Sequence, residues 1–234
     1  IIMSDADLDI AIPGVIDGMR YTRQGQACTA GSRVYIHEKI YDKVLNGAVE
    51  KLSKLKMGNA LDEKSDIGAI ISEEQLKRTL YYMDIAKKNS STKILHGGNQ
   101  SKGGDYKDGF YYEPTLLSGL PVSSPVCQEE VFGPVACAIP FKSFDEVMES
   151  ANDTQFGLSA VLWTKDLSRA LQFVDEIEAG FVQVNQCVAP RANVSYGGIK
   201  MSGLGKEYAF DSMMNHFTQS KTILINRGKS NLDV

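Results

Sequence analysis

Hydrophobic and polar positions follow two alternating patterns along most of this chain. Short runs rich in β-branched and aromatic residues predict strands at residues 33–37, 135–141, 158–163 and 181–185. Apolar residues that recur at spacings of three and four predict helices at residues 38–55, 73–89, 144–151 and 167–177. Strands that alternate with helices are typical of an α/β fold, so we expect a largely parallel sheet flanked by helices.

The two ends of the chain and one internal stretch depart from this alternation. Five glycines with Lys and Asp between residues 97 and 109 predict an exposed loop. Pro13 should kink or interrupt the first helical pattern. After a helix that ends near His216, residues 222–225 are predicted to form an apolar strand. Such a strand needs a partner edge, either within its own subunit or on another subunit. Residues 227–234 are predicted to be a frayed tail.

Length and charge limit the possible functions. With 234 residues, of which 43% are hydrophobic, the chain can bury one sizeable core. A formal net charge of -4 without a Lys/Arg block predicts no nucleic-acid partner, and the apolar runs are too short to cross a membrane. No secretory signal is recognisable, and because residue 1 is not Met we expect the natural start to lie upstream. We therefore expect a cytoplasmic protein, with an organelle matrix as the alternative.

The four cysteines, Cys28, Cys127, Cys137 and Cys187, are widely separated. None lies in a CxxC or Cys/His ligand spacing, and the three histidines are scattered, so we expect no metal site. Four such cysteines in a chain of this length do not predict a disulfide scaffold. We interpret them as free thiols in a reducing compartment.

Cys28 differs from the other cysteines because small residues surround it, in the segment GQACTAGSR at 25–33. Small neighbours let a substrate and the backbone approach closely. If Cys28 opens a helical turn, free backbone N–H groups would favour its thiolate, which is the nucleophilic form, and would stabilise an oxyanion formed on attack. The alternative is a cysteine that fills the core, which is our interpretation of Cys127, Cys137 and Cys187.

A pair of acids precedes the predicted strand at 135–141. Glu129 and Glu130 are adjacent, and Phe132 follows two positions later. Ligands of α/β proteins collect at strand ends, where a carboxylate can accept hydrogen bonds from ribose hydroxyls and an aromatic side chain can pack against a ring. The alternative is an ordinary solvated acidic turn.

A third segment, at residues 196–207, is rich in glycine but fits no phosphate-binding motif. The pattern GxGxxG fails because Tyr208 stands where the last glycine would be. The pattern GxxxxGK[ST] fails because no Ser or Thr follows Lys206. Taken alone, this segment predicts a tight loop before a helix.

Three segments, in their order along the chain, resemble motifs of the aldehyde dehydrogenase superfamily. GQACTAGSR resembles its nucleophile motif, EEVFGPV its cofactor-contacting strand motif, and SYGGIKMSGLGKE its C-terminal loop. The segments between these motifs resemble the family as well, for example at residues 65–68, 113–115 and 152–154. The resemblance covers residues 1–225. It implies an enzyme that oxidises an aldehyde to a carboxylic acid with NAD or NADP.

The resemblance implies a role for each residue near the reacting atoms. Cys28 would be the nucleophile, whose thiolate attacks the aldehyde to give a thiohemiacetal. Hydride transfer to the nicotinamide would then leave a thioester, which is hydrolysed. The backbone N–H of Cys28 would supply half of the oxyanion hole. Glu130 would hydrogen-bond the nicotinamide ribose, and Phe132 would pack beside the nicotinamide.

Further residues would surround the substrate, again by resemblance. Tyr196 would line the substrate tunnel, and Glu207 would belong to the proton-relay network. Asn185 and residues 186–194 would lie near the tunnel mouth. Because this loop contains no aromatic residue, we expect no strong aromatic box there, and which aldehyde is used stays open.

The resemblance also predicts what this chain lacks. In the family, the general base lies in a Glu-Leu-Gly-Gly-Lys-type motif that directly precedes a segment similar to residues 1–9. That motif is absent from this chain. The Asn that completes the oxyanion hole is absent as well, and so is the dinucleotide-binding domain. Because that domain holds the residue that distinguishes NAD from NADP, the sequence leaves the choice of cofactor open. We expect a catalytic domain at 1–214, an oligomerisation strand and tail at 215–234, and a fragment that is inactive alone. The full-length enzyme would be a homodimer or homotetramer.

Two other functions stay open. A cysteine-dependent esterase or acyltransferase would also use Cys28, although none of the histidines has a supporting motif. A non-catalytic module that self-associates would need only the strand at 222–225, which in the family joins the sheet of a neighbouring subunit.

Overall fold

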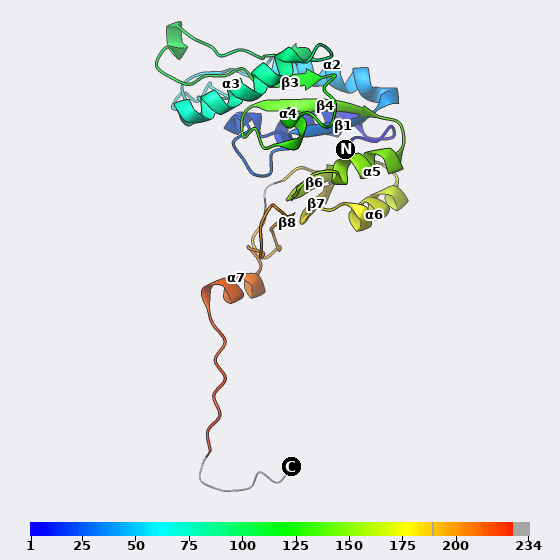
Figure 1. Cartoon of the computed structure of the whole chain (residues 1–234), viewed down its shortest axis with the longest axis vertical. Coiled ribbons are helices and arrows are strands. Elements are labelled where there is room, and N and C mark those ends of the chain that lie inside the picture. The colour runs from blue at the N-terminus through cyan, green and yellow to red at the C-terminus, as the bar shows by residue number, and fades with distance from the viewer. Residues whose placement is uncertain (189, 227–234) are drawn as a thin grey trace.

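The computed structural model describes residues 1–188 and 190–226 (Figure 1). Its largest sheet has the strand order β1–β4–β3–β2, with the bounds β1 Arg33–His37, β4 Val135–Phe141, β3 Thr115–Ser118 and β2 Lys93–His96. Strands β1, β4 and β3 run parallel, and β2 pairs with β3 in the antiparallel direction. The sheet is therefore largely parallel, with one antiparallel edge strand.

The first residues of the chain extend this sheet. The Ile2 N–H donates to the Tyr35 carbonyl (2.8 Å), and the Trp163 N–H donates to the Ile1 carbonyl (2.9 Å). Residues 1–3 therefore lie between β1 and β6, and β6 pairs in parallel with β7; the bounds are β6 Ser159–Leu162 and β7 Phe181–Val184. This arrangement confirms the predicted α/β fold.

Helices cover both faces of the sheet (Figure 1). One face packs against α1 (Leu8–Gly18) and α2 (Tyr41–Leu52), and the other against α3 (Glu73–Lys88), α4 (Pro125–Gln128), α5 (Phe144–Asn152) and α6 (Leu167–Glu176). Because side chains of a strand alternate between faces, Cys137 and Ile139 of β4 join the second core, whereas Ala136 and Ala138 join the first.

Polar caps set where several helices begin. The Ser72 hydroxyl accepts from the Gln75 N–H (3.2 Å) at the start of α3, and the Asp166 carboxylate accepts from the Ser168 N–H (2.9 Å) at α6. The remaining elements are short: η1 Tyr21–Arg23, η2 Glu38–Ile40, η3 Gly104–Tyr106, the antiparallel pair β5 Phe156–Gly157 and β8 Ile199–Lys200, and α7 Phe210–Phe217.

The predicted elements recur within a few residues of their expected bounds. The helix expected at 38–55 begins as the 3₁₀ turn η2 and continues as α2. The loop expected at 97–109 is largely exposed, and only η3 interrupts it. Strands β2 and β3 were not predicted from the sequence. Each has only two consecutive apolar residues between polar ones, KILH at 93–96 and TLLS at 115–118, which is too little for a strand pattern.

Pro13 was predicted to kink or interrupt the first helix. It does not interrupt the helix, because α1 runs through it from Leu8 to Gly18. A proline removes the hydrogen bond to the carbonyl four residues earlier, which here belongs to Asp9. Asp9 is exposed in the first turn of α1, where water can satisfy that carbonyl. The proline is therefore tolerated.

The C-terminal arm, residues 210–226, leaves the body of the molecule (Figure 1). Residues 222–225 were predicted to form a strand, but they pair with no strand in the described part of the chain. Whether these residues pair with an edge of their own subunit or of another one stays a prediction. The predicted tail at 227–234 lies outside the described residues. Within the described ranges, no helix is long and apolar enough to span a membrane.

Candidate active site

Cys28 lies in a turn between α1 and β1, and it does not open a helix as the sequence suggested. The Ala30 N–H donates to the Ala27 carbonyl (2.9 Å), which closes the turn around Cys28. The Gly31 N–H donates to the Gly18 carbonyl (2.9 Å) and ties the turn to the end of α1. The side chain of Cys28 is exposed, and its backbone N–H makes no hydrogen bond within the described residues. That N–H remains available as a donor.

Two glycines bring the Cys28 turn against the second sequence motif. Gly25 has φ +65°, a conformation that side chains disfavour, and a Cβ at this position would lie 2.3 Å from the Gly133 carbonyl oxygen. Only a glycine permits this approach. As a result the segment at 25–33 packs directly beside the segment at 129–135.

The two adjacent acids of the second motif have different surroundings. The Glu129 carboxylate accepts a hydrogen bond from the Tyr82 hydroxyl (2.7 Å). Burial, followed by this hydrogen bond, raises the pKa of Tyr82 to about 12. At Glu130 the hydrogen bond goes to the main chain instead, because Arg78 Nε donates to the Glu130 carbonyl (3.1 Å). The side chain of Glu130 is exposed. Glu129 therefore has a structural role, and the carboxylate of Glu130 is open to a ligand.

A cavity of about 440 Å³ joins the first two motifs. Cys28, Glu130 and Phe132 all line it. Phe132 has φ +54°, and Gln75 Nε2 donates to its carbonyl (2.8 Å), which holds this strained backbone in place. A nucleophile, a carboxylate and an aromatic ring thus share a space large enough for a small molecule. The carboxylate can accept a hydrogen bond from a sugar hydroxyl, and the aromatic ring can pack against a flat heterocycle.

Tyr196 brings the third motif to the nucleophile. Its hydroxyl lies 3.3 Å from Cys28 Sγ. Its ring is fixed by edge-on contacts with Phe181 (5.4 Å between centroids) and Tyr208 (5.8 Å). Burial raises the pKa of Tyr196, and the hydrogen bond with the Cys28 thiol and the nearby Glu207 charge act in the same direction. The phenol therefore keeps its proton.

Glu207 and Asn185 occupy different positions relative to this site. Tyr196 and Glu207 exchange two backbone hydrogen bonds (3.0 and 2.6 Å), so Glu207 lies beside Tyr196 with an exposed side chain. The Asn185 side chain instead pairs with the backbone of Thr164, through Oδ1 to the N–H (3.0 Å) and Nδ2 to the carbonyl (2.7 Å). It does not line the cavity that contains Cys28. Its assignment to the tunnel mouth stays a prediction.

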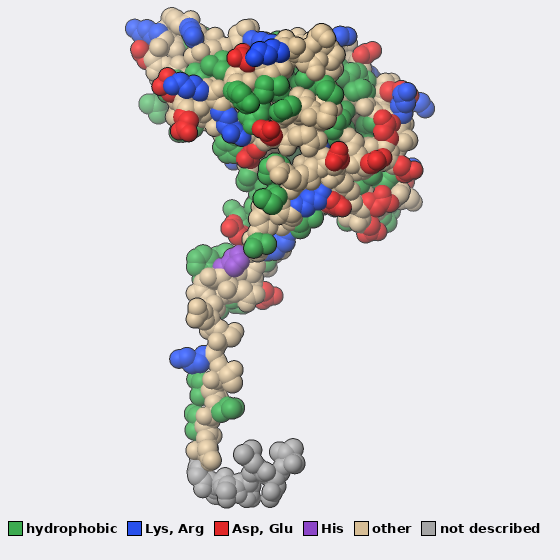
Figure 2. Space-filling model, in the orientation of Figure 1, with side chains coloured by type: hydrophobic (Ala, Val, Ile, Leu, Met, Phe, Trp, Pro, Cys, Tyr) green, Lys and Arg blue, Asp and Glu red, His purple; other side chains and the backbone are tan. Residues whose placement is uncertain are grey.

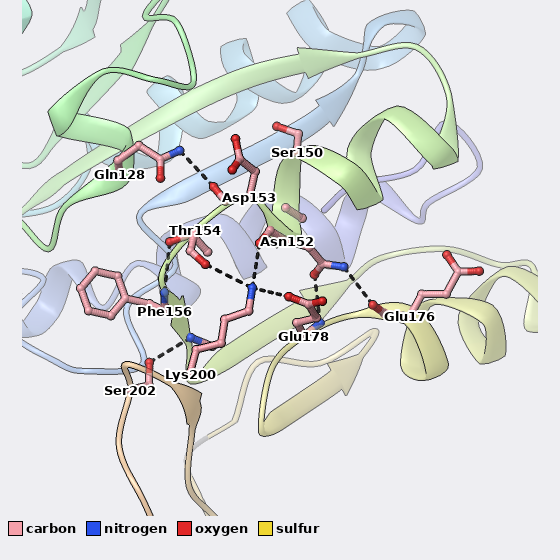
Figure 3. Close-up of polar contacts among 12 residues, drawn as sticks. Gln128, Ser150, Asn152, Asp153, Thr154, Phe156, Glu176, Glu178, Lys200 and Ser202 are labelled. Atoms are coloured by element: carbon pink, nitrogen blue, oxygen red, sulfur yellow. Dashed lines mark hydrogen bonds and ion pairs between the residues drawn. The ribbon is translucent and has the colours of Figure 1, made fainter.

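A polar network that the sequence reasoning missed holds the glycine-rich loop (Figure 3). Lys200 Nζ donates to the carbonyls of Asn152 (2.8 Å) and Thr154 (3.1 Å) and forms an ion pair with Glu178. The Asn152 Oδ1 accepts from the Glu178 N–H (2.9 Å). Beside it, the Gly157 N–H donates to the Ser202 hydroxyl (3.0 Å). The motif at 195–207 contains Lys200, but the positions that it contacts are scattered in sequence, so spacing carried no signal.

The other three cysteines agree with the core-filling interpretation. Cys127 of α4 and Cys137 of β4 are buried in the same core, and Cys187 is half-buried. A hydrogen bond with Cys127, together with burial, raises the pKa of the Cys137 thiol, and burial raises that of Cys187. Among the described residues no cluster of His, Cys, Asp and Glu could hold a metal ion. Cys28 is thus the exposed thiol at a cavity.

Comparison with known proteins identifies the family. The model of the aldehyde dehydrogenase family matches residues 1–223. An aldehyde dehydrogenase of Rhodospirillum rubrum is 38% identical over 221 residues, which cover 94% of this chain and 43% of that protein. The chain therefore belongs to the aldehyde dehydrogenase family.

Solved structures agree in fold. The NAD+ complex of an aldehyde dehydrogenase from Bacillus cereus has a TM-score of 0.90 at 32% identity, covering 97% of this chain and 45% of that one. A betaine aldehyde dehydrogenase double mutant from Staphylococcus aureus, with NAD+ and a BME-modified cysteine, has a TM-score of 0.91 at 32% identity, covering 99% and 46%. The chain spans less than half the length of these relatives.

Proposed function

We propose that this chain is the catalytic-domain portion of an NAD(P)-dependent aldehyde dehydrogenase and that Cys28 is its nucleophile. One observation carries the proposal. Cys28 is exposed, lines a cavity with Glu130 and Phe132, and contacts Tyr196, so three separate motifs meet at one thiol. Family membership and relatives solved with NAD+ support the choice of reaction.

The groups around Cys28 fit the first chemical step. The thiolate attacks the aldehyde carbon, forming a C–S bond while the carbonyl π electrons move to oxygen. The unpaired backbone N–H of Cys28 is a donor for the resulting oxyanion. The bound nicotinamide cofactor supplies an acceptor for the hydride that the thiohemiacetal carbon loses. Water then releases the carboxylic acid from the thioester and returns the thiol.

Glu130 and Phe132 are the residues on this chain that would hold the cofactor. The carboxylate of Glu130 is exposed at the cavity and suits a ribose hydroxyl, and Phe132 lines the same wall. Asn185 and Tyr196 are proposed to border the substrate path, and Glu207, beside Tyr196, to relay protons. We infer that residues 1–214 form the catalytic domain and residues 215–234 the oligomerisation segment. The choice between NAD and NADP is not made by these residues.

Self-association is part of the proposal, as a homodimer or homotetramer of the full-length enzyme. Large apolar side chains gather on the C-terminal arm (Figure 2). Phe217 is 79% exposed, Leu224 93% and Ile225 80%. Such a row of apolar residues is stabilised when a second chain covers it. A module that only self-associates would need this arm but would leave the Cys28 cavity without a function.

Limited alkylation tests the proposed nucleophile. We expect sub-stoichiometric iodoacetamide to modify Cys28 ahead of Cys127, Cys137 and Cys187, as mapped by mass spectrometry. Preferential modification of any other cysteine would contradict the assignment. Cys28→Ser, in the full-length enzyme, should lower aldehyde-dependent NAD(P)H formation by at least about a thousandfold. These 234 residues alone should form no NAD(P)H above the Cys28→Ser control. Ester hydrolysis without any nicotinamide dependence would instead favour an esterase.

A further inference from the structure

The contact between Tyr196 and Cys28 connects residues that lie 168 positions apart in the chain. The hydroxyl oxygen and Sγ are 3.3 Å apart, which is within hydrogen-bonding distance for sulfur. The Tyr196 ring cannot easily swing away, because Phe181 and Tyr208 pack against it edge-on. Its backbone is fixed as well, by the two hydrogen bonds with Glu207. The hydroxyl is thus held at the sulfur before any substrate binds.

The direction of this hydrogen bond follows from which group loses its proton first. A cysteine thiol ordinarily ionises at lower pH than a phenol. Burial raises the pKa of Tyr196 further, so the phenol keeps its proton under conditions in which a cysteine thiol gives up its own. Once Cys28 is a thiolate it has no proton to give, and the Tyr196 O–H is the donor. A hydrogen bond to a charged acceptor is stronger than one to a neutral acceptor.

We propose that Tyr196 is a positioning residue for the nucleophile, whose hydroxyl donates a hydrogen bond to the Cys28 thiolate, stabilises this charged form and orients Sγ. This inference rests on the proposed role of Cys28. It assigns Tyr196 a function in the resting enzyme, in addition to its proposed place beside the substrate path.

An aromatic side chain that only packed would need no hydroxyl at this place. Phe181 is an example of an aromatic side chain that only packs, because it contacts the Tyr196 ring and has no polar group. The hydroxyl of Tyr196 instead ends at the sulfur of the exposed cysteine. Removing the oxygen alone therefore separates the two roles, since Tyr196→Phe keeps the ring and its edge-on contacts.

The test compares the rate of Cys28 alkylation by iodoacetamide in the parent chain, Tyr196→Phe and Tyr208→Phe across pH. A donor to the thiolate increases the thiolate fraction but lowers its intrinsic nucleophilicity, and the first effect is the larger near neutral pH. We expect Tyr196→Phe to slow alkylation about four- to tenfold near pH 7. Near pH 10, which is above the pKa of about 8.5 of a free cysteine, the variant should react at least as fast as the parent.

Tyr208→Phe is the matched control, because it removes one hydroxyl from a ring that contacts Tyr196 but not the sulfur. It should follow the parent at every pH. Cys187, which is half-buried, serves as an internal reference for loss of folding. Equal rates for Tyr196→Phe and parent near pH 7, or the same loss at every pH, would overturn the inference but leave Cys28 as the nucleophile. Failure to alkylate Cys28 in the parent would overturn both proposals.

Discussion

At the scale of single residues, local surroundings decide which candidates are available for chemistry. Glu129 and Glu130 are adjacent in sequence, and both are exposed and line the cavity, yet only the Glu129 carboxylate accepts a hydrogen bond from Tyr82. Asn185, assigned to the substrate path by resemblance, uses both side-chain atoms on the backbone of Thr164. A residue's chemistry is therefore set by which partners have already engaged its polar atoms.

Gly25 is where a single methyl group should disturb the site. In Gly25→Ala, the positive φ is disfavoured and the new Cβ meets the Gly133 carbonyl oxygen at 2.3 Å. We expect the free energy of unfolding to fall by at least about 2 kcal/mol, measured by urea denaturation. Gly103→Ala is the control, since Gly103 has φ +83° but nothing within 4 Å of the new Cβ. It should lose only the conformational part, about 1 kcal/mol. Equal losses in both variants would argue against the close packing of the two motifs.

At the scale of elements, a two-residue strand positions the third motif. β8 pairs with β5 over only two residues, which is too little to hold a glycine-rich loop by backbone hydrogen bonds alone. The side chain of Lys200 adds two hydrogen bonds to carbonyls and an ion pair with Glu178 (Figure 3). The position of Tyr196 near Cys28 therefore depends on a lysine that never contacts the cavity.

We expect Lys200→Met to loosen the loop at 195–207. The loss of two charge-assisted hydrogen bonds at a partly exposed position should lower the free energy of unfolding by about 1 kcal/mol. Hydrogen exchange should speed up at Gly157 and Met201, which bond across this junction. Lys54→Met, which removes an exposed pair with Glu50, should change neither quantity measurably. Unchanged exchange at Gly157 in Lys200→Met would show that β5 and β8 hold the loop without the lysine.

At the scale of the whole molecule, the body of the chain buries its core while the arm does not. The two cores on either face of the sheet contain the buried apolar side chains of residues 1–188 except Tyr111. The arm carries the largely exposed side chains of Phe217, Leu224 and Ile225. Burying such side chains is favourable by roughly 1.5–3 kcal/mol each, which provides the driving force for association with a second chain.

Leu224→Asp should therefore weaken self-association by at least about tenfold in dissociation constant, measured by light scattering over a concentration series. A charge on the arm would have to be desolvated when a partner chain covers it. Leu61→Asp is the matched control, because Leu61 is also 93% exposed but lies in a loop of the body. A parent chain that is strictly monomeric at all concentrations would contradict the prediction.

The sequence by itself determined the α/β fold and most element bounds. Apolar periodicity is a local property, so β1, α3 and β4 could be read from windows of a few residues. It also singled out Cys28, Glu130 and Phe132, because each lies in a motif with unusual small or acidic neighbours. Motif order along the chain then indicated the family, which the comparisons confirmed.

Only the tertiary structure decided which of these residues meet. The contact of Tyr196 with Cys28, the engagement of Glu129 by Tyr82 and the anchoring by Lys200 all join segments distant in sequence. No local pattern encodes them, because they arise when packing of the whole core offsets the entropy of closing long loops. The same reason explains the arm. Residues 222–225 have the apolar pattern of a strand, but a strand forms only when it pairs with a neighbouring edge, and the described part of the chain shows no such pairing for them.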